Sequence, residues 1–172
     1  MRQTGHPKNK TKPVLFYVHT PFCEQLCNFC LCSKEITQDY SKVKGYLHDY
    51  LAKEFDMLEK HLADNKITFN FKEIYLGGGS PTYYKKEEFK YLVGRLRNLI
   101  DFNNLGDFTI EVDPRRVTEE TLIFYHEMGV NRLSFGIQDF DHGVQEEINR
   151  IQPPELLDKL LTPKIRKLFP VI

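Results

Sequence analysis

The sequence predicts an α/β fold, a partial (β/α) barrel of about four β–α units plus the start of a fifth. Two observations predict it. Short apolar segments alternate along the 172-residue chain with segments whose apolar residues recur at helical spacing, which is typical of a parallel sheet with helical crossovers. The expected strands also carry polar or small residues on one face near their C-terminal ends, where ligands bind in such folds.

The first two β–α units occupy the N-terminal part of the chain. The apolar segment Val14–Val18 predicts a strand, and an apolar stripe predicts a helix over Val43–Leu62 with Ser41 as its N-cap. A second strand is expected over Lys72–Leu76, where three glycines end it. The apolar residues of Glu87–Ile100 share one helical face and predict the second helix.

The third and fourth units follow in the same order. Asp107–Val112 is the third expected strand, and Thr118–Met128 is the helix after it, with Gly129 placed to cap its C-terminus. The fourth strand is expected over Asn131–Ile137 and the fourth helix over Asp141–Ile151. We therefore expect four parallel strands, each joined to the next by a helical crossover.

The two ends of the chain differ from the units between them. Residues 1–13 are expected to form a polar N-terminal arm, and residues 14–172 a single barrel domain. The last residues, Phe169–Ile172, look like the start of a fifth strand. Because a (β/α) barrel usually takes about 250 residues, we expect this barrel to be truncated, with an open sheet edge.

Alternate residues of the expected strands point to opposite faces of the sheet. One face is apolar, and the other carries polar or small residues that could hold a polar ligand. A solvent-exposed sheet face is one interpretation, and the inside of a barrel or crevice that holds a polar ligand is the one we favour. The residues of the polar face are Tyr17, His19, Tyr75, Gly77, Thr109, Glu111, Ser134, Gly136 and Gln138.

The composition argues against several classes of partner. Lys and Arg total 24, as do Asp and Glu, so the net charge is zero and a nucleic-acid partner is not expected. No apolar run approaches the roughly 20 residues of a membrane helix. The segment Met1–Lys12 is polar and basic and does not resemble a secretory signal. We expect a cytoplasmic protein without a membrane partner.

Four cysteines lie within ten residues, in the spacing Cys23-x₃-Cys27-x₂-Cys30-x-Cys32. Clustered thiolates favour a soft metal, either zinc or an iron–sulfur cluster, over a disulfide framework. A structural zinc site would use all four thiolates, usually as two pairs far apart in sequence. Three thiolates can instead hold three irons of a cubane and leave the fourth iron open for a methionine derivative.

Five segments together resemble the radical S-adenosylmethionine (SAM) superfamily and, within it, the oxygen-independent coproporphyrinogen III oxidase family. The resemblance runs from about Leu15 to Arg150. It implies a 4Fe-4S cluster held by Cys23, Cys27 and Cys30, without Cys32. The five segments are Tyr17–Cys32, Gly77–Thr82, Ile110–Arg115, Asn131–Ser134 with Gly136–Phe140, and Asn149–Arg150.

The resemblance also implies two SAM molecules and a reaction in haem biosynthesis. Tyr17, Gly78 and Glu111 would contact the SAM on the cluster. The second SAM would be contacted by Phe29, Gly79, Ser80, Gln138 and Arg150. The implied reaction is the oxidative decarboxylation of propionate side chains of coproporphyrinogen III to vinyl groups, with a reductant for the cluster. The expected truncation removes much of the substrate pocket, so we expect the 172-residue chain to be inactive alone.

Each residue assignment has a simpler alternative. The glycines Gly77–Gly79 could form only a turn, and Glu111 could pair with a surface lysine. Arg150 could cap the C-terminus of a helix. His19 could be a hydrogen-bonded structural histidine.

Two further interpretations concern the protein as a whole. One is a haem-chaperone-like relative that binds porphyrin without decarboxylating it. The other is a non-catalytic zinc or structural domain, or a pseudogene product. Haem-chaperone-like relatives typically lack residues equivalent to Cys32, Asp113 and Asp139, so these residues favour the oxidase.

Overall fold

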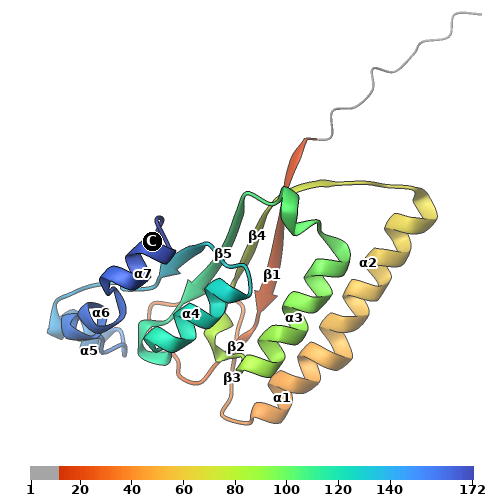
Figure 1. Cartoon of the computed structure of the whole chain (residues 1–172). Coiled ribbons are helices and arrows are strands. Elements are labelled where there is room, and N and C mark those ends of the chain that lie inside the picture. The colour runs from red at the N-terminus through yellow and green to blue at the C-terminus, as the bar shows by residue number, and fades with distance from the viewer. Residues whose placement is uncertain (1–11) are drawn as a thin grey trace, which may run out of the picture.

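The computed structural model describes residues 12–172 (Figure 1). Four parallel strands form one sheet in the order β1-β4-β5-β6, which confirms the predicted sheet. The expected arm over residues 1–13 lies mostly outside the described residues, and Pro13 already belongs to β1. The strands span Pro13–Thr20 (β1), Asn70–Gly78 (β4), Asp107–Val112 (β5) and Arg132–Phe135 (β6).

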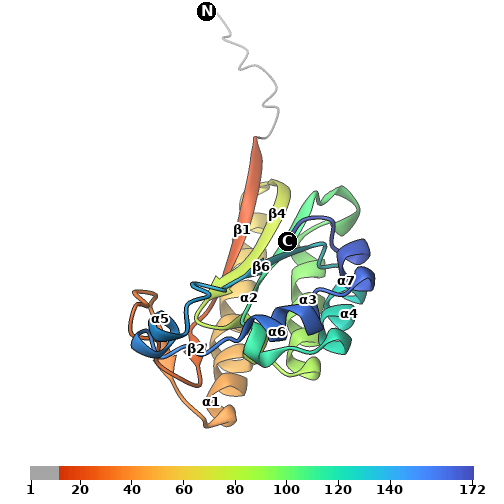
Figure 2. The same ribbon diagram turned by 90° about the vertical axis from the view of Figure 1, so that its left-hand side faces the viewer.

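Helices α2, α3 and α4 cover one face of this sheet (Figures 1 and 2). The predicted helix over Val43–Leu62 is part of a longer helical run, in which a π-helical segment, Tyr46–Leu51, joins α1 to α2. Among the described residues, no helix is both long enough and apolar enough to cross a bilayer. The bounds are Tyr40–Gly45 (α1), Ala52–Asn65 (α2), Lys86–Leu99 (α3) and Glu119–Glu127 (α4).

Helix ends follow local capping chemistry. The carboxylate of Asp39 accepts hydrogen bonds from the backbone N and the Oγ of Ser41, at 3.0 and 2.6 Å. Asp39 has an extended backbone, whereas Ser41 already lies inside α1. The prediction of Ser41 as N-cap is therefore wrong, because an aspartate two residues earlier supplies the acceptor. The role predicted for Gly129 is confirmed, since it has a φ of +106° and donates its N–H to His126 O after α4.

The core lies between the sheet and these helices. On the sheet, Ile74, Leu76, Phe108, Ile110 and Leu133 are at most 2% exposed. They pack against the apolar stripes of the helices, and each such side chain contributes about 1.5–3 kcal/mol by leaving water. The helix residues that complete the core include Leu47, Phe55, Phe89, Leu92, Leu96, Leu122 and Tyr125.

The last part of the chain departs most from the prediction. Strand β6 ends at Phe135 and α5 at Glu147, two and four residues earlier than expected. The residues beyond them form loops that turn toward the C-terminal ends of the strands. Val171 makes one parallel bridge with Arg132, which confirms the start of a fifth strand beside β6. The helices here span His142–Glu147 (α5), Pro154–Leu160 (α6) and Pro163–Leu168 (α7).

Short elements that the sequence analysis did not predict lie in the connecting loops. Strands β2 (Phe22–Cys23) and β3 (Glu35–Ile36) pair with each other in parallel and bring together the two ends of the cysteine segment. Three 3₁₀ turns, at Pro81–Tyr83, Phe102–Asn104 and Pro114–Arg116, complete the set.

Candidate functional site

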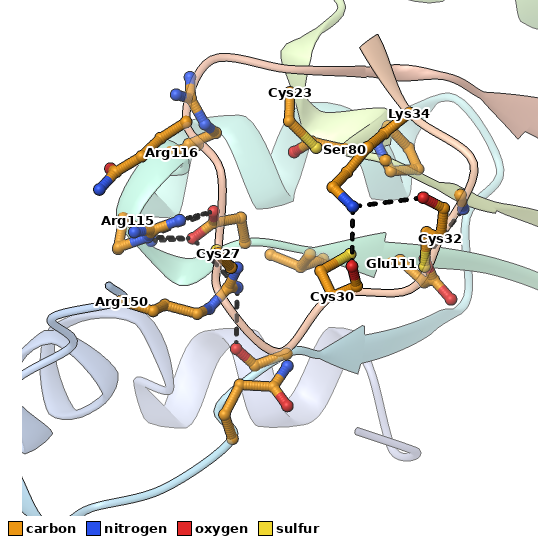
Figure 3. Close-up of a pocket in the computed structure, with 18 of the residues that line it drawn as sticks. Cys23, Cys27, Cys30, Cys32, Lys34, Ser80, Glu111, Arg115, Arg116 and Arg150 are labelled. Carbon is orange, nitrogen blue, oxygen red and sulfur yellow. Dashed lines mark hydrogen bonds and ion pairs between the residues drawn. The ribbon is translucent and has the colours of Figure 1, made fainter. Parts of the chain in front are cut away.

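A cavity of about 320 Å³ opens at the C-terminal ends of the strands (Figure 3). Its lining includes Glu111, Ser134 and Gly136 of the polar sheet face, as the alternation of polar residues predicts. Every predicted site residue except Tyr17 lines it. These residues are Cys23, Cys27, Phe29, Cys30, Gly78, Gly79, Ser80, Glu111, Gln138 and Arg150.

Of the three predicted ligands, Cys23 ends β2, and Cys27 and Cys30 lie in the loop between β2 and β3, the cysteine loop (residues 24–34). All four cysteines are free thiols; Cys27 is buried, and Cys32 is exposed. Lys34 Nζ donates to Cys30 O at 2.8 Å and to Cys32 O at 3.3 Å, which closes the end of the loop. Within residues 12–172, no three His, Cys, Asp or Glu side chains are gathered closely enough to hold a single metal ion.

The thiols have different proton affinities. Burial raises the pKa of Cys23 to about 11, and the neighbouring Cys30 and Cys27 add to this. For Cys30, burial is outweighed by hydrogen bonds from Cys32 and by the charge of Lys34, which together lower the pKa of its thiol. Because a bound metal needs thiolates, metal binding here releases protons and is favoured at higher pH.

The glycines at the C-terminal end of β4 bring backbone, without side chains, to the wall of the cavity. Gly78 has a φ of +110°, and a Cβ there would lie 2.5 Å from His19 Nδ1. A Cβ on Gly79 would lie 2.7 Å from Phe22 O. Gly79 N also donates to Thr20 O at 2.6 Å, which joins the ends of β1 and β4. The segment therefore does more than turn the chain, because it forms a wall that tolerates no side chain.

Glu111 is held in place from two sides. Its carboxylate accepts from Tyr75 Oη at 2.9 Å and from the backbone N of Gly78 at 3.1 Å. In the described part of the chain it makes no ion pair with a lysine, so the surface-pair alternative is wrong. The carboxylate is thus oriented within the cavity by residues of β4.

Tyr17 and His19 lie next to this cavity on β1. The Tyr17 side chain is half exposed and stacks on Tyr75, with ring centroids 6.0 Å apart. His19 Nδ1 lies 3.2 Å from Tyr17 Oη, and its Nε2 lies 2.8 Å from Ser33 O. Both ring nitrogens of His19 have partners, which supports the structural interpretation of this histidine.

Arg150 points its guanidinium into the cavity. Nη2 donates to Gly136 O at 2.9 Å, and Nη1 lies 3.6 Å from Cys27 Sγ. Its Nε is buried without a partner among the described residues. Among the described residues its guanidinium donates to Gly136 O, whereas its backbone N donates to Gln145 O of α5 at 2.8 Å, so any cap on α5 comes from the backbone of Arg150.

Several charged residues of the site were missed from the sequence. Asp113 accepts from Arg115 Nε at 2.9 Å and Nη2 at 2.7 Å, and it lies 3.5 Å from Arg150. Burial opposes ionisation of this carboxyl, but Arg115 and Arg150 hold the pKa of Asp113 below its usual range. Arg116 pairs with Glu24. Asp113, Arg115 and Arg116 come directly after β5. This position could have indicated them as site residues, because loops at the C-terminal ends of strands face the ligand.

The remaining site residues line the cavity from different loops. Ser80 is buried, with Oγ 3.1 Å from Thr82 Oγ1. Phe29 lines the cavity with an exposed side chain. Gln138 has a φ of +71°, a conformation that residues other than glycine rarely adopt and that is concentrated at functional sites.

Known proteins match the chain over most of its length. It is 38% identical over 157 residues to the oxygen-independent coproporphyrinogen III oxidase of Pseudomonas aeruginosa, which covers 90% of this chain and 32% of that protein. The enzyme of the same name from Escherichia coli is 37% identical over 153 residues, with 87% and 32% covered. The chain thus spans about a third of the length of these curated relatives.

A solved structure agrees with the sequence matches. Coproporphyrinogen III oxidase from Escherichia coli, described as a radical SAM enzyme, superposes with a TM-score of 0.80 at 34% identity. The match covers 95% of this chain and 36% of that one, so the fold corresponds to part of that enzyme. The family model of the radical SAM superfamily matches residues 17–162. The cysteine loop, the sheet and the cavity at its C-terminal edge therefore belong to a chain of the radical SAM superfamily.

Proposed function

We propose that this chain holds a 4Fe-4S cluster through Cys23, Cys27 and Cys30 and binds SAM beside it. The observation that carries the proposal is that these thiols line the same cavity as the bare backbone of Gly78 and the oriented carboxylate of Glu111. The family match supports it, because the superfamily is defined by this pair of cofactors.

The residues present fit such a cluster. The three thiols are free to ligate, and none is tied up in a disulfide. The cations Lys34, Arg115 and Arg150 line the cavity, where they offset the negative charge of thiolates and sulfides. The unpaired Nε of Arg150 is a donor that still needs an anionic or carbonyl partner.

The residues also fit SAM. Tyr17, Gly78 and Glu111 are assigned to the SAM on the cluster, because a carboxylate suits ribose hydroxyls and a glycine backbone allows close approach. A second SAM is assigned to another set of residues of the same cavity, where Arg150 suits a carboxylate. Phe29, Gly79, Ser80 and Gln138 complete that second set. A cavity of about 320 Å³ is at the small end of the range for small-molecule sites.

The cofactors supply the chemistry, since a reduced cluster gives one electron to SAM and so yields a carbon radical that removes hydrogen from a substrate. The chain's own residues bind, orient and exclude water. The substrate is assigned from the relatives as coproporphyrinogen III, whose propionate groups would each lose a hydrogen atom, CO₂ and one electron to leave vinyl groups. The reaction would also require a reductant for the cluster and an acceptor for the electron that leaves the substrate.

The first test is anaerobic reconstitution of the chain with iron and sulfide, followed by an assay for 5′-deoxyadenosine with SAM and a reductant. We expect slow SAM cleavage, because the wall from Cys23 to Glu111 is in place. We expect no conversion of coproporphyrinogen III by this chain alone, because the half-exposed Tyr17 leaves the polar sheet face open to water. Bound zinc in place of iron, with no SAM cleavage, would contradict the proposal.

A second prediction concerns Glu111. Glu111→Ala is expected to weaken SAM binding to the reconstituted chain by about 1–3 kcal/mol, through the loss of hydrogen bonds to a charged acceptor. Glu111→Gln keeps the shape and one acceptor and should lose less. Calorimetric titration measures both, with and without the cluster. Equal SAM affinity in the presence and absence of the cluster would argue against this arrangement.

A further inference from the structure

The cysteine loop has little internal structure. In the part of the chain that the structure describes, one backbone hydrogen bond joins two of its residues, Cys30 N to Cys27 O at 3.1 Å. The β2–β3 pair fixes its two ends and Lys34 fixes its last turn. In the first half of the loop, Arg115 and Arg116 hold Cys27 and Glu24 from the end of β5, and the backbone of the other residues takes its conformation from another segment.

That segment is the end of α5 and the three residues after it. Four consecutive residues of the cysteine loop, 25 to 28, are each held by residues 147 to 150, and Figure 2 shows α5 beside this loop. Asn28 donates its backbone N to Ile148 O at 3.0 Å and its Nδ2 to Glu147 O at 2.7 Å. The last carbonyls of a helix lack partners within it, and here the cysteine loop supplies them.

Asn149 makes the central contacts. Its Nδ2 donates to Leu26 O at 2.8 Å, and its Oδ1 accepts from Gln25 Nε2 at 2.9 Å. Gln25 Nε2 also reaches Asn149 O at 3.3 Å. Asn149 has a φ of +54°, a left-handed conformation that asparagine adopts more readily than most residues. Both ends of its amide are thus used on the loop.

We propose that Asn149 is a positioning residue for the cysteine loop, whose amide keeps Cys27 turned into the cavity before any cluster is present. Asn149 contacts Leu26, which is the residue before Cys27. Arg150, the residue after Asn149, contacts the Cys27 thiol itself. One short segment therefore holds the backbone next to Cys27 and places one of the two guanidiniums at its thiol, the other being that of Arg115. This inference rests on the proposed function, because it takes the purpose of the ordered loop to be assembly of the cluster.

The test uses the full chain without a cluster and the variant Asn149→Gly. Glycine accepts the left-handed backbone, so this change removes the amide without adding strain. Lys66→Gly is the matched control, because Lys66 is an exposed residue with a φ of +52° at the end of α2. Gln25→Ala and the double variant with Asn149→Gly complete a double-mutant cycle. Alkylation of the buried Cys27, followed by mass spectrometry, reports opening of the loop.

We expect Asn149→Gly to speed Cys27 alkylation by roughly three- to ten-fold, the factor by which a net hydrogen bond of this kind shifts an opening equilibrium. The double variant should add little to it, and the thermal unfolding midpoint should match that of Lys66→Gly. After reconstitution, Asn149→Gly should also lose its cluster faster to a chelator.

Two results would overturn the positioning role. One is that Cys27 is alkylated in Asn149→Gly at the wild-type rate. The other is that the unfolding midpoint of Asn149→Gly falls so far that global unfolding alone accounts for the faster alkylation. A wild-type chain that assembles no four-iron cluster would instead overturn the proposed function, while the alkylation rates would still decide whether Asn149 orders the loop.

Discussion

Replacing Cys23, Cys27 or Cys30 by alanine is expected to abolish the iron–sulfur cluster of the reconstituted chain. The wild-type chain should bind about four irons and turn brown, because three thiolates hold three irons of a cubane. Each single loss leaves two ligands on a cavity that is open to solvent on one side. Iron and sulfide content and visible absorption, measured anaerobically, check the result.

Cys32→Ala is the matched control for these variants. Cys32 is the exposed member of the four, and it stands one residue beyond the expected ligand set. We expect its alanine variant to keep the cluster. Loss of the cluster in Cys32→Ala, with retention in Cys30→Ala, would mean that the ligand set is misassigned.

Replacing Gly78 by alanine is expected to destabilise the chain without cluster by about 2–4 kcal/mol, since a strained φ and overpacking each cost about 1–3 kcal/mol. The φ of +110° disfavours any side chain, and the new Cβ would meet the His19 ring and, at 3.0 Å, Thr20 O. The ring cannot easily move away, because Tyr17 and Ser33 hold both of its nitrogens. Denaturant titration measures the loss.

Gly94→Ala provides a control of opposite sign. Gly94 lies inside α3, and a Cβ there would meet no heavy atom within 4 Å. Alanine favours the helix over glycine by about 0.5–1 kcal/mol, so this variant should be slightly more stable than the wild type. Equal stabilities of the two variants would show that the Gly78 backbone is not constrained as described.

The sheet and most of the cavity wall could be predicted because their signals are local. Alternation of side chains along a strand fixes which residues share a face, and the ends of parallel strands must meet at one edge. Glu111 and the glycines at the end of β4 therefore came together as expected. The family resemblance added residues such as Arg150, whose place in the cavity no local pattern indicates.

What could not be predicted depends on contacts between distant residues. Helix α5 was expected to reach Ile151, yet it ends at Glu147, because Asn149 turns left-handed where it meets Gln25 and Leu26. The N-cap at Asp39 failed for a different reason. Two residues with capping side chains stood close together, and sequence alone did not decide between Asp39 and Ser41.

The contacts between the cysteine loop and the end of α5 also constrain when the site can form during synthesis. They join residues that lie 119 to 124 positions apart. At a translation rate of about 5–20 residues per second, the ribosome releases the cysteines roughly 6–25 seconds before Asn149 and Arg150. Through that interval Arg115 and Arg116 can already hold Cys27 and Glu24, but the segment that holds residues 25 to 28 is missing. For the proposed cluster, we therefore expect the finished site to be available for iron and sulfide only after translation has passed residue 150.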